Sequence, residues 1–347
     1  MRIRWDRANR SFFWLVGVVL VPYVLVGLVG CGLLGFIGYR VATDGLSDLS
    51  AGGHNLWPAV GAFVVLGLGA VLAAVSGWRQ LRATDRLQER IHDLALPAPP
   101  ALAEAAREAR LGRRLDYVDA VEPFAFAYGF GRPRVAVSRG LFEVATPAEI
   151  SAVLAHERYH VRNFDPAKVV AAKVLSAAYF FLPALQGLRT RYRAASELAA
   201  DRKAVMRCGH AAVAGALYRV VRGPDWPELT TAAAMASSEL LEVRIRQLET
   251  GHEPDVAPVS SARVALTLVA LAAVAGALVV AVISAGGPSA LMRSSMGSRA
   301  VGSNGMGSMS MGFGMTDLLW IPPAGALIAL AVWRRSRRPL TLQSRSR

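Results

Sequence analysis

The feature that most constrains the fold of this chain is a set of four apolar runs. An apolar helix of about 20 residues is long enough to cross a bilayer. Tryptophans stand at both ends of the second run, where interfacial aromatic residues are expected. The fourth run is shorter and contains two adjacent prolines. The sequence therefore predicts a mainly α membrane protein with four transmembrane helices, at residues 12–38, 57–78, 264–285 and 318–333.

Arginines beside these runs indicate the orientation of the chain in the membrane. The net charge is +14, and its clustering beside apolar runs favours an anionic bilayer surface over direct nucleic-acid binding. Because basic flanks stay on the cytoplasmic side, both termini and the segment 79–263 are predicted to be cytoplasmic. These flanks hold Arg2, Arg4, Arg7, Arg10, Arg79, Arg82, Arg86, Arg90, Arg263, Arg334, Arg335, Arg337 and Arg338, whereas the opposite loops hold Arg40, Arg293 and Arg299.

The spans divide the chain into four parts. An N-terminal hairpin covers 1–78, a cytoplasmic domain 79–263, a C-terminal hairpin 264–333 and a basic tail 334–347. Cys31 lies in the first run and follows a basic start, as in a lipoprotein processing site. The residues after it stay apolar, which favours a continuing span.

The central polar segment combines short strands with helices. An Ala/Pro-rich stretch at 94–103 is typical of a linker. Short β-like runs follow at 117–121 and 134–138, separated by aromatic residues and a Gly/Pro turn. A helix is predicted from Thr146 to about Asn163, because Thr caps a helix start, Pro fits the first turn, and Glu149 can complete a capping box. Asp165 and Pro166 are then expected to end this helix.

Two histidines on this helix are spaced to share a metal ion. His156 and His160 are one turn apart, so both imidazoles can reach the same ion. Glu157 is placed to take a proton from a water molecule that the metal activates. These residue types favour Zn²⁺, one ion per chain. The alternative is a solvated helix face with two incidental histidines.

A third ligand is expected on a later helical stretch. Glu197 and Asp201 are one turn apart, so Glu197 can bind the metal while Asp201 holds a ligand histidine by a hydrogen bond. The alternative is an ordinary exposed acidic pair. Both acids lie in a basic neighbourhood within an otherwise apolar Leu-Ala-Ala stretch.

These motifs, in this order, resemble the integral-membrane zinc metallopeptidases. The similarity covers roughly 117–250 and is carried by four elements: the segment 126–138, Glu149, the stretch from Leu154 to Asp165, and the stretch from Glu197 to Asp201. Two branches are similar, the BlaR/MecR-type antirepressor peptidases and the HtpX-type quality-control proteases. The resemblance implies a cytoplasmic α+β zincin-like (gluzincin) domain held at a bacterial cell membrane.

The resemblance also implies a role for each matching residue. His156, His160 and Glu197 would bind zinc, Glu157 would be the general base, and Asp201 would orient a ligand. The strand Arg134, Val135, Ala136, Val137, Ser138 would pair with substrate backbone as a sheet edge. Arg244 is similar to a late arginine in both branches and is a candidate for stabilising the transition state. No counterpart of the HtpX-branch His-Pro-Pro element is present, and His210 is a candidate for stabilising the oxyanion.

The apolar residues 169–188 lie between the histidines and Glu197. One complete membrane crossing there would place the third ligand on the wrong side of the bilayer. We expect a helix packed under the catalytic domain or dipping into the membrane face. A plain core helix is the alternative.

The outer loop 286–316 is rich in Gly, Ser and Met. Closely spaced thioethers suit soft Cu(I), whereas Met can also serve as polarizable filler at the membrane surface. The residues in question are Met292, Met296, Met306, Met309, Met311 and Met315.

The predicted function is regulatory proteolysis. The four-span layout and the missing His-Pro-Pro element favour an antirepressor-like protease in signal transduction, acting on a cytoplasmic repressor of the BlaI type. One alternative is HtpX-like quality control of membrane proteins. Another, of a different class, is a non-catalytic membrane receptor with a structural metal site.

Overall fold

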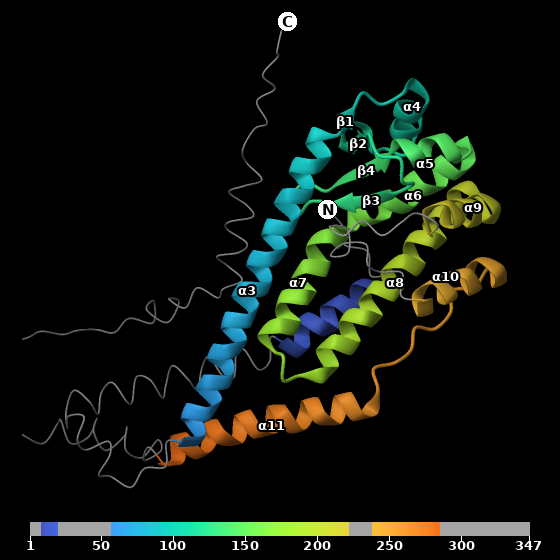
Figure 1. Cartoon of the computed structure of the whole chain (residues 1–347). Coiled ribbons are helices and arrows are strands. Elements are labelled where there is room, and N and C mark those ends of the chain that lie inside the picture. The colour runs from blue at the N-terminus through green and yellow to red at the C-terminus, as the bar shows by residue number, and fades with distance from the viewer. Residues whose placement is uncertain (1–7, 20–56, 222–237, 285–347) are drawn as a thin grey trace, which may run out of the picture.

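The computed structural model describes residues 8–19, 57–221 and 238–284. Within these ranges the chain is mainly helical, with a small sheet at one end and apolar helices at the other (Figure 1). The first predicted span is described only at 12–19, which is helical. The rest of that span with Cys31, the fourth span, the Met-rich loop and the basic tail lie outside the described residues, so those predictions stay predictions.

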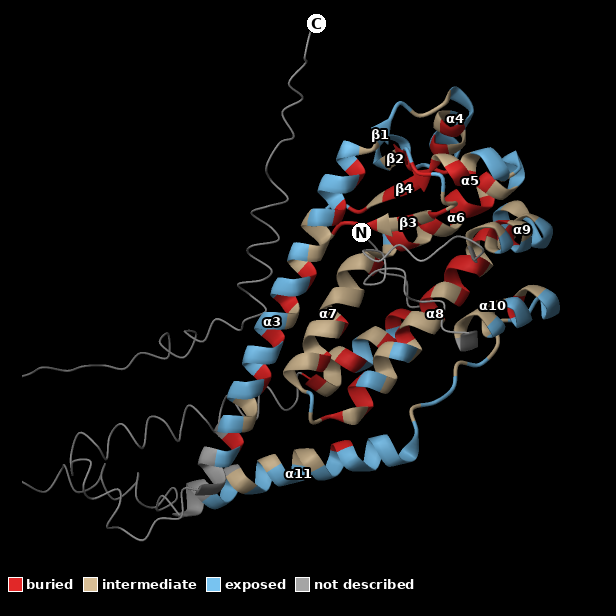
Figure 2. Ribbon diagram, in the orientation of Figure 1, coloured by how far each residue is buried: buried red, intermediate tan, exposed pale blue. Residues whose placement is uncertain are grey.

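The longest helix joins the apolar end to the sheet. Helix α3 covers Trp57–Asp93 without a break. Its part Val64–Asp93 is the one helix of the described residues that is long and apolar enough to cross a membrane. Its apolar side chains are largely exposed (Figure 2). The predicted second span, 57–78, therefore lies within the first part of α3, and the predicted domain boundary at residue 78 falls inside a continuous helix.

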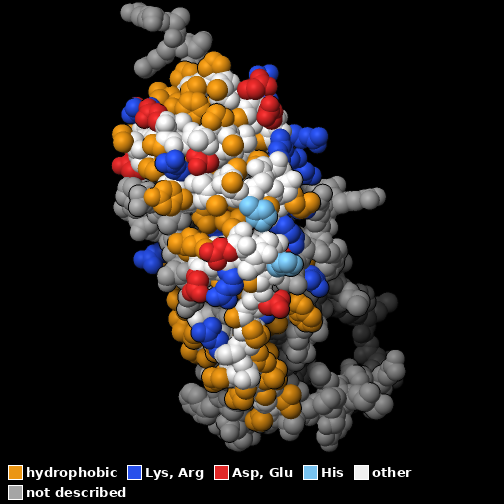
Figure 3. Space-filling view, turned by 90° about the vertical axis from the view of Figure 1, so that its right-hand side faces the viewer, with side chains coloured by type: hydrophobic (Ala, Val, Ile, Leu, Met, Phe, Trp, Pro, Cys, Tyr) orange, Lys and Arg blue, Asp and Glu red, His pale blue; other side chains and the backbone are white. Residues whose placement is uncertain are grey.

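Helix α11, Ser261–Ser284, corresponds to the third predicted span. Its apolar part, Ser261–Ala277, is shorter than a full span, so among the described residues one candidate span stands where four were predicted for the chain. Helix α11 contacts α3 and α8. The lower end of the face in Figure 3 carries mainly hydrophobic and uncharged side chains, and charged ones lie above it.

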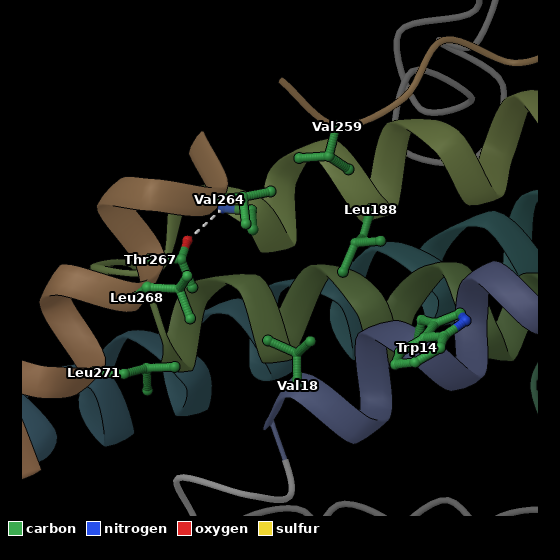
Figure 4. Close-up of a pocket in the computed structure, with 9 residues that line it drawn as sticks. Trp14, Val18, Leu188, Val259, Val264, Thr267, Leu268 and Leu271 are labelled. Carbon is green, nitrogen blue, oxygen red and sulfur yellow. Dashed lines mark hydrogen bonds between the residues drawn. The ribbon is translucent and has the colours of Figure 1, made fainter. Parts of the chain in front are cut away.

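An apolar cavity of about 350 Å³ lies between α11, α8 and the helical residues 8–19 (Figure 4). The backbone N–H of Ala184 donates to the hydroxyl of Thr267 across 3.0 Å, which joins α8 to α11 beside the cavity. The lining side chains are almost entirely apolar, among them Trp14, Val18, Leu188, Leu268 and Leu271.

The sheet has four strands in the order β1-β2-β4-β3. Strand β4 is parallel to β2 and antiparallel to β3, while β1 is antiparallel to β2. Strand β4 is therefore central, and the prediction that the strand from Arg134 to Ser138 is a sheet edge was wrong. Its neighbour β3 is the outer strand. The bounds are Ala95–Leu96 (β1), Leu115–Val118 (β2), Ala125–Tyr128 (β3) and Arg134–Ser138 (β4).

The predicted linker at 94–103 is structured instead. It contains β1 and the start of helix α4, Pro100–Glu108. Leu102 and Ala106 of α4 are buried in the main core, so apolar burial outweighs the Ala/Pro composition. A short 3-10 turn, Gly112–Arg114, then leads into β2.

Two apolar clusters pack around the sheet. Val135 and Val137 of β4 belong to the cluster shared with helices α4 and α6, and Ala136, between them, belongs to the cluster shared with the end of α3. This alternation is the two-residue period of a strand. Helix α5, Arg139–Val144, follows β4 directly. A Cβ at Gly140 would lie 1.7 Å from the Val121 carbonyl oxygen, so only glycine fits this approach.

Five further helices complete the domain. The single helix expected for 169–188 was wrong, because α7 ends at Ala178 and α8 begins at Pro183, so the segment folds back as a helical hairpin. Proline fits the first turn of α8 but cannot continue a helix. The bounds are Pro147–Asn163 (α6), Asp165–Ala178 (α7), Pro183–Cys208 (α8), His210–Val221 (α9) and Ser238–Thr250 (α10).

Candidate metal centre

Helix α6 carries the histidine pair and begins as predicted. The Thr146 hydroxyl accepts from the Glu149 backbone N–H, and the Glu149 carboxylate accepts from the Thr146 N–H, which is a complete capping box. The helix packs against α8 and strand β3. It therefore lies between the sheet and the helix that bears the predicted third ligand (Figure 1).

The structure brings the three predicted ligands together. One ligand atom from each of His156, His160 and Glu197 lies within 4.8 Å of the others. The two imidazole Nε2 atoms are 3.1 Å apart. The Glu197 carboxylate oxygens lie 3.4 Å from Nε2 of His156 and 3.6 Å from Nε2 of His160. Two nitrogens and one oxygen directed at a common point match the ligand set of a catalytic zinc site.

Asp201 orients the first histidine, as predicted. Its carboxylate is fully buried and lies 2.8 Å from Nδ1 of His156. A carboxylate only accepts hydrogen bonds, so Nδ1 carries the hydrogen and Nε2 is left for a metal. One turn of α8 separates Asp201 from the ligand Glu197, so a single helix supplies both groups.

Arg244 of helix α10 neutralises both acids. Its Nε and one terminal nitrogen donate to the two oxygens of Asp201 at 2.7 and 2.8 Å. Its other terminal nitrogen lies 3.3 Å from Glu197. All three guanidinium nitrogens therefore face these carboxylates, which indicates a positioning role for Arg244 more than contact with a transition state.

Asp165 orients the second histidine, a role that was not predicted from the sequence, where Asp165 and Pro166 were expected only to end the helix. Its Oδ2 lies 2.7 Å from Nδ1 of His160. The residue between α6 and α7, Phe164, has a left-handed backbone with φ of 56°, and this turn brings Asp165 back against the helix that it follows. The sequence feature that could have indicated this role is an acidic residue five positions after the second histidine.

Glu157 is buried beside the ligands and reaches strand β3. Its carboxylate accepts a hydrogen bond from the backbone N–H of Ala127. The general-base candidate is therefore held between the metal-ligand group and the outer strand of the sheet.

The environments of the two glutamates move their pKa values apart. Burial raises the pKa of Glu157 above its ordinary value, although the two histidines oppose the rise. Burial by itself would raise the pKa of Glu197 as well, but His160, Arg244 and His156 hold that pKa well below the ordinary range. Glu197 is therefore a permanent anion suited to bind a cation, whereas Glu157 is better suited to exchange a proton.

A comparison with known protein families adds independent evidence at this point. Residues 82–250 match the model of peptidase family M48. The matched segment begins inside α3 and ends with α10, so it contains the sheet and all the metal-site residues described above from α6, α8 and α10. Peptidases of family M48 are zinc-dependent, and the His156, His160 and Glu197 group fits that ion.

Curated relatives of this chain are named as proteases. Protease HtpX of Pseudomonas putida is 35% identical over 149 residues, which are 41% of this chain and 48% of the relative. Protease HtpX homolog of Thermoplasma acidophilum is 37% identical over 84 residues, 23% of this chain and 26% of the relative. Protease HtpX homolog 2 of Methanosarcina mazei is 45% identical over 62 residues, 17% of this chain and 21% of the relative.

The chain spans about half the length of these relatives at most. Together, the M48 match, the relatives and the apolar helix α3 support a membrane-type zinc metallopeptidase. They carry no information on the antirepressor subtype.

His210, the other candidate for stabilising an oxyanion, makes its hydrogen-bond contact with helix α10 and not with the three candidate metal ligands. It begins helix α9, is exposed, and its Nδ1 lies 3.2 Å from the Leu248 carbonyl oxygen near the end of α10. The contact ties α9 to α10, and the sequence signal of a lone histidine gave no means to distinguish such a packing contact from a site residue.

Zinc binding to the M48-like site is expected to release protons at pH 7. Burial disfavours a charged His156, but hydrogen bonds to Asp201 and Glu197 raise its pKa to about 10, and the pKa of His160 is raised as well. At pH 7, which is below the pKa of His156, the metal-free site holds a proton that zinc must displace. Zinc affinity should thus rise with pH, by about tenfold per unit for each displaced proton.

Isothermal titration with zinc in buffers of different ionisation enthalpy measures this release. We expect at least one proton per zinc ion at pH 7. Binding that releases none, with an affinity that does not change between pH 6 and 8, contradicts the protonation described for the metal-free site.

Proposed function

We propose that this chain is a membrane-bound zinc endopeptidase that hydrolyses peptide bonds of cytoplasmic or membrane-associated proteins. The observation that carries the proposal is the convergence of His156, His160 and Glu197 within 4.8 Å, with Glu157 buried beside them. A purely structural zinc site usually has four protein ligands, whereas three leave a position for water and substrate.

The chain's own residues would divide the chemistry as follows. Bound zinc supplies Lewis-acid activation of water and polarises the peptide carbonyl. Glu157 takes the proton from the attacking water and passes it to the leaving amine. Asp201 and Asp165 keep the two imidazoles in the orientation that presents Nε2.

The outer strand β3 is the proposed binding edge for substrate backbone. The Ser138 N–H donates to the Phe124 carbonyl oxygen across 3.0 Å. Antiparallel bonding alternates along a pair, so with the observed register the backbone groups of Ala125 and Ala127 point away from β4. No strand of the described residues pairs with that side of β3. The Ala127 N–H on that side donates to the Glu157 carboxylate, so a substrate strand added there would pair with the other outward groups of β3 and lie next to Glu157.

Metal removal tests the peptidase proposal directly. The purified full chain in detergent is expected to cleave an unfolded reporter protein, to lose all measurable cleavage when zinc is chelated, and to regain it when one equivalent of Zn²⁺ is returned. The readout is the rate of appearance of new peptide N-termini. Cleavage that persists after complete chelation rules out a zinc peptidase.

Two biological roles remain as proposals, each with its own support. The predicted four-span layout and the absence of a His-Pro-Pro element favour a regulatory, antirepressor-like protease whose substrate is a cytoplasmic repressor of the BlaI type. The relatives named Protease HtpX favour a quality-control protease. Both roles require the cytoplasmic orientation that the arginine pattern predicts.

Quantitative proteomics of cells carrying the wild type or Glu157→Gln separates the two roles. A regulatory protease should lower the amount of one or a few soluble repressors, with changes in the genes they control. A quality-control protease should change many membrane proteins, mainly under stress. A broad membrane-protein response without any repressor cleavage removes the regulatory role.

A further inference from the structure

Asp165 is the centre of a buried hydrogen-bond network that reaches far beyond the metal ligands. Besides Nδ1 of His160, its Oδ2 accepts from the Ser196 hydroxyl at 2.5 Å. Its Oδ1 accepts from the Tyr192 hydroxyl at 2.8 Å and from the Asn163 side-chain amide at 2.5 Å. With His160, these make four donors to the two carboxylate oxygens. The three donors other than His160 hold the carboxylate in place, and the carboxylate in turn orients the imidazole of His160.

Asn163 continues this network to the N-terminal helix. Its Oδ1 accepts from the side-chain amide of Asn9 at 3.0 Å and from Nζ of Lys168 at 2.9 Å. Lysine only donates, so the oxygen of the Asn163 amide must face Lys168 and its nitrogen must face Asp165. The orientation of Asn163 that serves Asp165 is therefore determined by the groups on its other side.

Asn9 is completely buried although it lies 154 residues from Asn163 in the chain. Its own Oδ1 accepts from Nζ of Lys168 at 2.5 Å. Both ends of the Asn9 amide are thereby engaged with α6 and α7. A buried amide is costly unless it is hydrogen-bonded, so these bonds set the position of the helix at residues 8–19 against the two helices.

A second contact joins the same helix to Asp165. The ring of Phe12 packs against the ring of Tyr192 with centroids 5.4 Å apart. Tyr192 is fully buried in a cluster with Ala8 and Ala195, and its hydroxyl is one of the four donors to Asp165. The helical residues 8–19 (dark blue in Figure 1) thus contact the partners of Asp165 at two points.

We propose that the N-terminal helix completes the metal centre, with Asn9 as a positioning residue that acts on the ligand His160 through Asn163 and Asp165. The inference rests on the proposed function in so far as a metal binds at the histidine pair. Without Asn9, Asn163 loses one of the two donors that orient it, and the hold of Asp165 on His160 weakens. Loss of the partners of a metal-ligating histidine typically weakens metal affinity 10–100-fold.

The test measures the zinc dissociation constant of the full chain in detergent by competition with a chelator. Asn9→Leu keeps the side-chain volume and removes both hydrogen bonds. Asn9→Asp keeps the acceptor for Lys168 and removes only the donor to Asn163, and it serves if Asn9→Leu does not fold. We expect zinc binding about tenfold weaker in either variant, the low end of the range because Asn9 acts through two residues.

Leu15→Ala is the matched control on the same helix. Leu15 is fully buried and packs with Ala172, Leu182 and Leu185, so its truncation loosens the docking of the helix without removing a hydrogen bond to Asn163. The melting temperature of each metal-free variant is measured alongside, which separates zinc affinity from the stability of the fold.

Weaker zinc binding in the Asn9 variants, with Leu15→Ala close to the wild type, supports the inference. An unchanged zinc affinity in the Asn9 variants overturns it and leaves the proposed function intact. Equal losses in Asn9→Leu and Leu15→Ala also overturn it, because general docking of the helix then explains the effect. A wild-type chain that binds no zinc overturns the proposed function and this inference together.

Discussion

Replacing Glu157 with glutamine is expected to lower the rate of peptide-bond cleavage roughly 10²–10⁴-fold while one zinc ion per chain stays bound. Glutamine has nearly the same shape but cannot accept the proton of the attacking water. The three ligand side chains are unchanged, and Asp201 and Asp165 still hold the two histidines. The measurements are the cleavage rate of a reporter protein and the zinc content of the same preparation.

Glu143→Gln is the control for this prediction. Glu143 is an exposed carboxylate at the end of α5 whose side chain is 56% exposed, and its replacement should leave both quantities unchanged. The comparison also decides between an enzyme and a non-catalytic receptor with a structural metal site. If Glu157→Gln cleaves every substrate as fast as the wild type, Glu157 is not the base and the peptidase assignment is wrong.

Replacing Arg244 with methionine is expected to cost about 3–5 kcal/mol of folding stability in the metal-free protein. Arg244 is paired with Asp201, which is fully buried, and with Glu197, which is 12% exposed. Methionine retains most of the volume but removes the charge, so two buried carboxylates lose their cation. Their pKa values, held low by Arg244 among other groups, should rise.

Arg246→Met on the same helix is the matched control. Arg246 pairs with Glu242 at 2.8 Å, but the two side chains are 59% and 70% exposed, and an exposed pair contributes less than about 1 kcal/mol. The measurement is thermal unfolding of both variants in detergent, with chelator and with zinc. Zinc should reduce the loss in Arg244→Met, because the ion supplies positive charge next to Glu197. Equal shifts in the two variants would show that Arg244 is no more than a surface charge.

Several elements were predictable because their signals are local. The histidines of α6 share a face because four residues make about one helical turn, and the Thr146 capping box and the Asp165-Pro166 pair mark the ends of that helix in the sequence itself. The apolar length of α3 is likewise a property of consecutive residues. Glu197 and Asp201 were identifiable because they are one turn apart on a single helix.

Errors arose where a residue's role depends on its neighbours in space. A strand such as β4 has the same alternating pattern at the edge or in the middle of a sheet, and only pairing with β2 and β3 made it central. The segment 169–188 is apolar in both halves, and its reversal before Pro183 packs both halves into one cluster with Leu15 and Val19. Composition does not distinguish these outcomes.

The sequence by itself determined the make-up of the candidate site: the types and spacing of the possible metal ligands, the glutamate next to the first histidine, and the apolar helix that leads to the domain. The tertiary structure alone decided which strand is the outer one, that Asp165 holds His160, and that Asn9 reaches the network around the metal site. The physical reason is that helix periodicity and capping act between residues a few positions apart, whereas these contacts join residues whose proximity depends on how the whole chain packs.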